Sequence, residues 1–245
     1  DRKITLLAYQ DQVINGYLNA KNAVIEAPTG RGKTMAMALA VLNYSLTHHC
    51  RPKLLWITPM RALARDTERQ LSSIFSYFFP DISILLRTGD SSSYQKKKVR
   101  STDWDILITT PESAALLSSY PDTVDRFKSL QLVVVDEWHS LMNQKRGILF
   151  ELFLSWLHDF VPNHRRWALS ATLSCPKKAA MILAPGQDCA HFRDGYQKTI
   201  QAELLLPKSD DPRFNALGKK LIPQLIQDIR AVKSSILFTT TRSQS

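Results

Sequence analysis

The chain has 245 residues, of which 44% are apolar and 22% charged, and its 32 Lys and Arg against 22 Asp and Glu leave a net charge of 32 − 22 = +10. This composition excludes a disordered or collagen-like chain, because it supplies enough apolar surface for a sizeable core. A transmembrane protein is also excluded, because no apolar run approaches the ~18 residues that a membrane span needs. Three cysteines without a CxxC pair, and an opening segment unlike a signal peptide, lead us to expect a reduced, intracellular protein.

Short apolar segments rich in β-branched residues alternate along the chain with longer stretches of helical periodicity. This alternation predicts an α/β fold, in which a mostly parallel central sheet is covered by helices on both faces. Helices are predicted over 34–46 and over a segment in which apolar residues recur from 63 to 78. The predicted strands are 23–26, 53–57, 82–86, 105–109, 132–135, 167–170 and 236–239.

One segment, 206–213, looks like a seam between two domains, because Pro, Ser and Asp residues cluster there. We therefore predict one domain over residues 1–206, and a linker followed by the start of a second domain over 207–245. Within the second part, 214–232 reads as a helix and 236–241 as a strand. Because the chain begins at Asp1 and its last residues run out of a predicted strand, we expect a fragment of a longer protein.

Glycine is scarce, with 8 residues in the chain, yet two of them lie close together in the segment APTGRGKT between the first predicted strand and the first predicted helix. This is the setting of a phosphate-binding loop, in which backbone N–H groups surround the phosphates and the helix N-terminus faces their negative charge. Lys33 would reach the β- and γ-phosphates of a nucleotide, and Thr34 would bind Mg²⁺. The predicted site for ATP and Mg²⁺ comprises Ala27, Pro28, Thr29, Gly30, Arg31, Gly32, Lys33 and Thr34.

A second site signal is the segment LVVVDEWH, in which an apolar strand ends in two carboxylates. At the carboxyl end of a parallel strand, Asp136 can hold Mg²⁺ through water, and Glu137 can polarise the water that attacks the phosphate. In isolation the two acids could also cap the following helix, but the phosphate-binding loop favours the catalytic interpretation. Together the two segments predict nucleotide hydrolysis.

Eight segments in order resemble the first RecA-like domain of DExH-box superfamily 2 helicases. The similarity is greatest to the Lhr type, and within it to the bacterial DNA ligase-associated branch. Ala27 stands where the general phosphate-loop pattern has its first glycine, a variant typical of this superfamily. The resemblance implies a RecA-like ATP-binding domain over 1–206 and a truncated start of a second RecA-like domain over 207–245. The segments are APTGRGKT (27–34), TPMRALARDT (58–67), RTGDSSS (87–93), ITTPES (108–113), VVVDEWHSL (133–141), KRG (145–147), LSATLS (169–174) and LFTTTRSQS (237–245).

The resemblance also implies roles for single residues. Gln10, which lies 27 − 10 = 17 positions before Ala27, is similar to the glutamine that contacts adenine in related helicases, although Gln12 competes for this role and a surface glutamine is the simpler alternative. Arg31 stands where the family commonly has a small hydroxylic residue, and its role stays open. The catalytic residues are Lys33, Asp136, Glu137 and His139, and the residues that couple nucleotide state to strand binding are His139, Ser170, Ala171 and Thr172.

A surface for a nucleic-acid strand is implied by further segments of the same family. In this family the contacts with the strand are N–H, hydroxyl and guanidinium groups that bind its phosphates and read no base sequence. The net charge of +10 is consistent with binding to phosphates. A basic cluster at 96–100 is better explained as a solvated helix face. The matching residues are Thr58, Pro59, Arg61, Thr88, Gly89, Thr109, Thr110, Pro111 and Glu112.

The function that the resemblance implies is an ATP- and Mg²⁺-dependent helicase that moves 3′ to 5′ along single-stranded DNA in repair. It would act in the bacterial cytoplasm at the nucleoid, with a DNA ligase or nuclease as a candidate partner and no membrane. Two alternatives stay open: a helicase of RNA or RNA–DNA hybrids, because contacts to phosphate and sugar need not exclude a 2′-hydroxyl, and a nucleotide- or strand-binding module without catalysis. A P-loop kinase is disfavoured by the SAT and TTPES segments.

The later helicase motifs, including the arginines that complete the ATP site, do not appear before Ser245. We therefore expect this chain alone to hydrolyse ATP very slowly and not to unwind duplexes.

Overall fold

The computed structural model describes residues 5–142, 144–196, 199 and 225–236. The chain divides into two compact units, Asp1–Gln197 and Lys198–Ser245. In the second unit, residues 225–231 are helical, within the helix predicted over 214–232. The predicted domain boundary at 206 and 207, and all but the first residue of the strand predicted over 236–241, lie outside the described residues.

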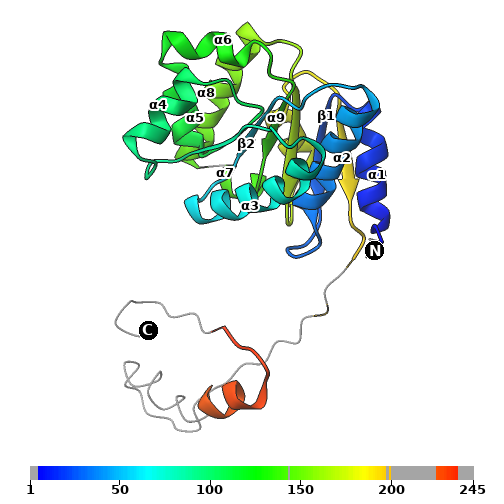
Figure 1. The fold of residues 1–245 in the computed structure, drawn as a ribbon. Coiled ribbons are helices and arrows are strands. Elements are labelled where there is room, and N and C mark those ends of the chain that lie inside the picture. The colour runs from blue at the N-terminus through cyan, green and yellow to red at the C-terminus, as the bar shows by residue number, and fades with distance from the viewer. Residues whose placement is uncertain (1–4, 143, 197–198, 200–224, 237–245) are drawn as a thin grey trace. The chain divides into compact units, whose positions relative to one another are not determined.

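The described part of the first unit contains a seven-stranded sheet in which all pairs are parallel. The strands follow the order β3-β4-β2-β5-β6-β1-β7 across the sheet, and Figure 1 labels β1 and β2 within it. The central strands are buried along their whole length, as expected for strands covered on both faces. Their bounds are β1 Asn22–Glu26, β2 Leu54–Ile57, β3 Ile84–Arg87, β4 Ile106–Thr109, β5 Leu132–Val135, β6 Arg165–Ser170 and β7 Cys189–Arg193.

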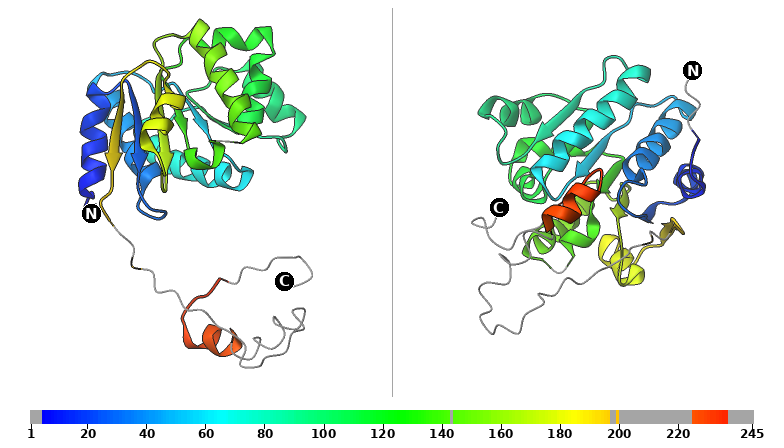
Figure 2. Two further views of the ribbon diagram at one scale, coloured as in Figure 1. Left: turned by 180° about the vertical axis from the view of Figure 1, so that it is seen from behind. Right: turned by 90° about the horizontal axis from the view of Figure 1, so that it is seen from below.

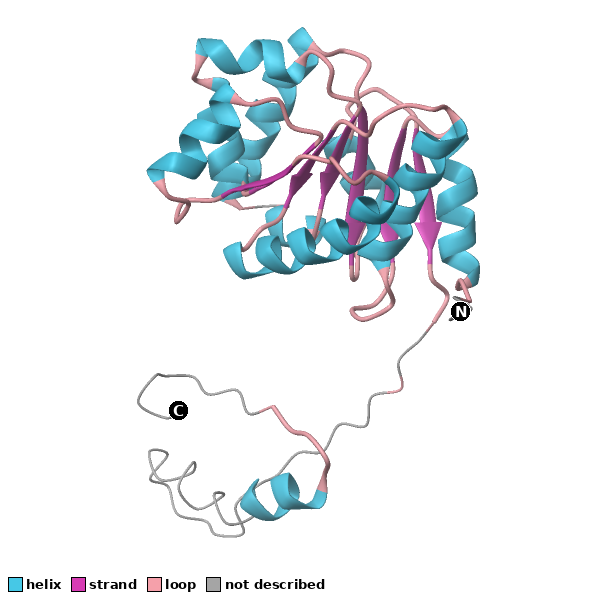
Figure 3. Ribbon diagram, in the orientation of Figure 1, coloured by secondary structure: helices cyan, strands magenta, loops and turns pink. Residues whose placement is uncertain are grey.

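Helices cover both faces of this sheet, which lies between them in Figure 3. Because successive side chains of a strand point to opposite faces, β1 sends Ile25 into one core and Val24 into the other. The helices α1 to α3 pack on the first face, and α4 to α9 on the second. The helices are α1 Ala8–Asn19, α2 Lys33–Thr47, α3 Arg61–Phe78, α4 Ser93–Ser101, α5 Pro111–Ser118, the short 3₁₀ helix Pro121–Thr123, α6 Val124–Phe127, α7 Trp138–Leu141, α8 Lys145–Phe160 and α9 Pro176–Leu183.

The predicted α/β fold is confirmed, and six of the predicted strands correspond to β1 to β6. The two helices predicted in this unit correspond to α2 and α3, whereas helices α1 and α4 to α9 and strand β7 were not predicted. Strand β7 lies at the edge of the sheet and is largely half-exposed, so its residues lack the apolar run of a buried strand. Helix α1 lies beside it (Figure 2), where Gly16 leaves room for the ring of Phe192. The buried stripe of α1 is only Tyr9, Val13 and Tyr17 with the polar Gln10, which is too narrow and polar to stand out in the sequence.

The carboxyl ends of all seven strands lie at one edge of the sheet, because the strands are parallel. At this edge Glu26 pairs with Ser170 and with Arg193, while Ile57 pairs with Thr109 and Val135. The segments that follow these strands therefore emerge side by side, although they are far apart in the sequence. No helix in the described part of the chain is long and apolar enough to cross a membrane.

Candidate functional site

The segment 27–34 forms a turn between β1 and α2. Gly30 and Gly32 have φ values of 82° and 76°, in the left-handed region that glycine enters without steric cost. Gly32 also caps α2, so the free N–H groups of the first helical turn face the loop. A Cβ on Gly32 would lie 2.7 Å from Nε2 of Gln10, so a larger residue there would displace this side chain. The Nζ of Lys33 donates to the carbonyl oxygen of Ala27 at 2.8 Å, which folds the loop around the ammonium group.

Two carboxylates follow β5 at the same edge. Asp136 is 7% exposed, and its backbone N–H donates to the carbonyl of Ile57 at 2.8 Å. Burial and the nearby charge of Glu137 together raise the pKa of Asp136 to about 6, and the hydrogen bond from the Glu137 N–H and the attraction of Lys33 oppose them only in part. Burial likewise lowers the pKa of Lys33 against the pull of Glu137 and Asp136. The two acids therefore bring more negative charge to this edge than the lysine balances.

The oxygen atoms at this edge suit Mg²⁺. Thr34 is the second residue of α2 and half-buried, and both its hydroxyl and the Asp136 carboxylate are hard oxygen donors. The raised pKa of Asp136 means that the buried carboxylate lacks a sufficient counter-charge, which a divalent cation would supply. The residues present thus fit the ion that the sequence predicts.

A chain of polar contacts joins Glu137 to β6. The Nδ1 of His139 lies 3.1 Å from Oγ of Ser170 and 3.4 Å from Oε2 of Glu137. Ser170 is completely buried, and its hydroxyl donates to the carbonyl of Thr172 at 3.2 Å. Its carbonyl accepts the N–H of Ala27 at 3.1 Å. The predicted coupling segment, with Ala171 half-buried in its middle, therefore contacts both the phosphate loop and the catalytic segment.

Helix α1 contacts the phosphate loop through two side chains. The Nε2 of Gln10 donates to the carbonyls of Arg31 and Gly32 at 3.2 and 3.3 Å, and the hydroxyl of Tyr9 donates to the Arg31 carbonyl at 2.5 Å. Gln12, the competing candidate, is exposed. Of the two glutamines, only Gln10 lies against the loop. At the loop itself, Pro28 is half-buried, and Thr29 is exposed.

The side chain of Arg31 points away from the loop interior. Its Nε donates to Oδ2 of Asp194 at 2.7 Å, and its guanidinium lies 4.4 Å from the ring centre of Tyr196. Both partners follow β7, which the sequence did not predict, so nothing in the sequence pointed to this contact. Arg31 therefore links the phosphate loop to the segment after β7 through an ion pair and a cation–π contact.

A second group of predicted residues surrounds a pocket of about 380 Å³. Arg61 pairs with Asp90 at its rim. Arg146 pairs with Glu112, and its Nη2 donates to the carbonyl of Pro59 at 2.6 Å. Arg146 was not predicted to lie at this surface, although it belongs to the KRG segment of the family resemblance. The lining residues include Pro59, Arg61, Gly89, Thr110, Glu112 and Arg146.

Of the predicted threonines, Thr110 lines this pocket, and the hydroxyls of three of them bond to neighbouring loop residues. The hydroxyl of Thr58 donates to the carbonyl of Met60 at 3.2 Å, that of Thr109 to the carbonyl of Arg87 at 2.7 Å, and that of Thr110 to Ser113 at 3.3 Å. Because these side chains and that of Thr88 are buried, they hold the loops in place. Pro111 occupies the first turn of α5, where its missing N–H costs nothing.

Several known proteins resemble this chain in sequence. A sequence profile of the DEAD/DEAH box helicase family matches residues 7–181. The ATP-dependent helicase Lhr-Core of Methanocaldococcus jannaschii is 32% identical over 242 residues, which cover 91% of this chain and 28% of that protein. The ATP-dependent DNA helicase homolog MER3 of Arabidopsis thaliana is 34% identical over 90% of this chain and 21% of its own length.

A solved structure shows the same fold. The Mycobacterium smegmatis helicase Lhr bound to single-stranded DNA and AMP-PNP superposes with a TM-score of 0.82 at 26% identity, over 98% of this chain and 32% of that one. The predicted RecA-like fold is thereby confirmed, and the chain spans less than a third of the length of these three relatives. The profile match over residues 7–181 and the structural likeness together show that this chain belongs to the DEAD/DEAH box helicase family and is of the Lhr type.

Proposed function

We propose that this chain is the ATP-binding part of an ATP- and Mg²⁺-dependent helicase, and that it holds one strand of nucleic acid at the carboxyl edge of its sheet. The observation that carries the proposal is the convergence of the phosphate loop, the two carboxylates and the His139–Ser170 contact at one edge, with the pocket around Arg61 at the carboxyl ends of neighbouring strands.

Each residue then has a distinct task. The N–H groups at the start of α2 and the ammonium of Lys33 would hold the phosphates, for which Lys33 must leave the carbonyl of Ala27. Thr34 and Asp136 would hold Mg²⁺, which neutralises phosphate charge. Glu137 would orient the attacking water. His139 and Ser170 would transmit the change at the nucleotide to the strand surface.

DNA is the favoured strand. The relatives that resemble this chain include a DNA helicase and an Lhr structure that holds single-stranded DNA. Movement from 3′ to 5′, a role in repair, and a ligase or nuclease partner are supported by the family resemblance. Paired ATPase assays on the protein with its remaining domains, with single-stranded DNA and RNA of equal length, test the choice of strand. Greater stimulation by RNA would favour the alternative.

Two substitutions test the catalytic assignment. In the protein with its remaining domains, Glu137→Gln should retain ATP affinity and lose turnover, because it keeps the shape of the site and removes the group that orients water. Lys33→Ala should lose affinity as well. If Glu137→Gln changes neither binding nor turnover, the chain is a binding module and the catalytic proposal is wrong.

A further inference from the structure

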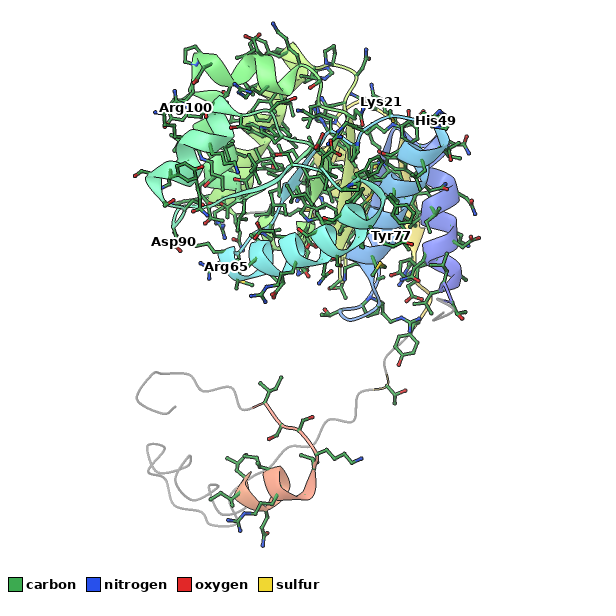
Figure 4. The ribbon with its side chains drawn as sticks, viewed as in Figure 1. Lys21, His49, Arg65, Tyr77, Asp90 and Arg100 are labelled. Carbon is green, nitrogen blue, oxygen red and sulfur yellow. The ribbon has the colours of Figure 1, made fainter. Side chains whose placement is uncertain are left out.

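A second pocket, of about 540 Å³, lies between α4 and the end of α5. Its walls carry four cationic side chains, Arg87, Lys96, Lys97 and Arg100, and a single carboxylate, Asp122. The local balance of these charges is 4 − 1 = +3. Figure 4 labels Arg100 on α4 and Asp90 in the loop before this helix. None of the residues predicted to bind nucleotide or nucleic acid lines this pocket.

Arg87 is the buried charge of the pocket. The residue is 2% exposed, makes no ion pair with any described carboxylate, and has an Nη1 without a hydrogen-bond partner in the described structure. Burial lowers the pKa of its guanidinium, as expected for a cation that lacks a counter-charge. The ring of Tyr120 packs 5.7 Å from this guanidinium and 4.0 Å from that of Arg100.

The neighbouring charges do not satisfy Arg87. The only acid of the pocket, Asp122, is already paired with Arg100, at 2.9 Å from its Nη2. Lys96 donates to the carbonyl of Gly89 at 3.0 Å, and Lys97 makes no hydrogen bond or ion pair with any described residue. The pocket thus has a surplus of positive charge, and its most buried cation, Arg87, has no carboxylate partner among the described residues.

We propose that this pocket binds a phosphate of the nucleic-acid strand, as an extension of the strand surface around Arg61; the inference rests on the proposed function. A phosphodiester supplies the missing negative charge and the acceptor oxygens that guanidinium and ammonium groups need. A strand is favoured over other anions because the two pockets share one loop. Gly89 lines the first pocket and accepts from Lys96 of the second, while Arg87 directly precedes that loop.

Helix α4 offers a matched pair of variants. Lys97 lines the basic pocket, whereas Lys98 lines a different pocket beside Glu68 and Ile84. Lys97→Ala and Lys98→Ala remove the same charge from the same helix, so the overall field of the protein changes equally. We expect Lys97→Ala to weaken binding of a labelled oligothymidylate about five-fold and to reduce the slope of log K against log salt by about 0.7. Lys98→Ala should change both quantities much less.

Arg87→Met tests the buried charge, since methionine fills similar space without a cation. If its melting temperature matches that of the unmodified chain, it should weaken strand binding at least as much as Lys97→Ala. Equal effects of Lys97→Ala and Lys98→Ala would refute the pocket, because they would show only a general charge effect.

Arg61→Ala serves as the reference for the proposed function. If Arg61→Ala weakens oligonucleotide binding while Lys97→Ala and Lys98→Ala have equal affinities, the basic pocket does not bind the strand. The proposed function would still stand in that case. If the unmodified chain does not bind the oligonucleotide, the proposed strand binding and the pocket both fail. Competition experiments with inorganic phosphate and with polyglutamate distinguish a nucleic-acid strand from other anions. If Lys97→Ala weakens the binding of polyglutamate but not that of the oligonucleotide, the assignment to nucleic acid is wrong.

Discussion

Lowering the pH from 7 to 5 should destabilise this protein through one buried side chain, His164, which lies just before β6 and is 2% exposed. Its Nδ1 contacts the carbonyl oxygen of Val161, and its Nε2 accepts a hydrogen bond from Nε of Arg166 at 2.9 Å. A neutral ring satisfies both contacts, because Nδ1–H donates and Nε2 accepts. A second proton on Nε2 would point at a guanidinium. Burial, against the hydrogen bond to Val161 and with the charge of Arg166, lowers the pKa of His164 from 6.5 to about 4.

The sign and size of the effect follow from the two pKa values. In the unfolded chain the imidazole protonates near pH 6.5, whereas in the folded chain it stays neutral until about pH 4. Protons therefore bind preferentially to the unfolded state, and stability falls as the pH falls through this window. At pH 5 this difference in pKa shifts the folding equilibrium towards the unfolded state by a factor of about 30, which corresponds to about 2 kcal/mol.

Urea denaturation of the nucleotide-free chain at pH 7 and pH 5 measures this effect. His164→Gln lacks the titrating group, so its loss of stability between the two pH values should be about 2 kcal/mol smaller than that of the unmodified chain, although its stability at pH 7 is lower. His49→Asn is the control, because His49 is exposed at a left-handed position that asparagine tolerates. If His164→Gln keeps the full pH dependence, the reasoning is wrong.

Three further predictions concern activity, packing and strand binding. This chain alone should turn over ATP more slowly than ~1 s⁻¹ even with single-stranded DNA, because the motifs that complete the site do not occur before Ser245; a steady-state ATPase assay at or above that rate would contradict this. Gly147→Ala should lower the free energy of unfolding by at least about 2 kcal/mol, because its Cβ would lie 2.0 Å from the carbonyl oxygen of Leu141. The control Gly195→Ala places its Cβ in open space and should leave the free energy of unfolding unchanged. Equal urea midpoints for the two variants would refute the packing argument. Arg146→Ala should weaken oligonucleotide binding several-fold without changing ATP affinity, since it removes the bridge between Glu112 and Pro59; fluorescence anisotropy checks the first quantity, and an unchanged affinity would remove Arg146 from the strand surface.

The local parts of the nucleotide site were predictable because each is encoded within one short segment. A phosphate loop needs glycine where φ is positive and a lysine at the start of the helix, and both requirements fall within eight consecutive residues. The same holds for an apolar strand that ends in two acids. Arg61 and Glu112, which the family segments assign to a strand surface, line one pocket, and their roles in binding a strand stay predictions.

Contacts between distant segments depend on the packed sheet and could not be predicted in this way. Arg31 meets Asp194 because β7 pairs with β1 at an edge whose half-exposed strand gave no clear sequence signal. Arg146 reaches Pro59 across 87 positions.

The basic segment 96–100 shows, within one helix, the difference between what the sequence determines and what the tertiary structure decides. Its sequence alone determined that several positive charges lie close together, and it favoured a solvated face. The tertiary structure decided that Lys97 faces a pocket with Arg87 while Lys98 faces another. Burial, and therefore the cost of an uncompensated charge, depends on what the rest of the chain places around a residue, and that is decided only when the sheet and its two helical layers assemble.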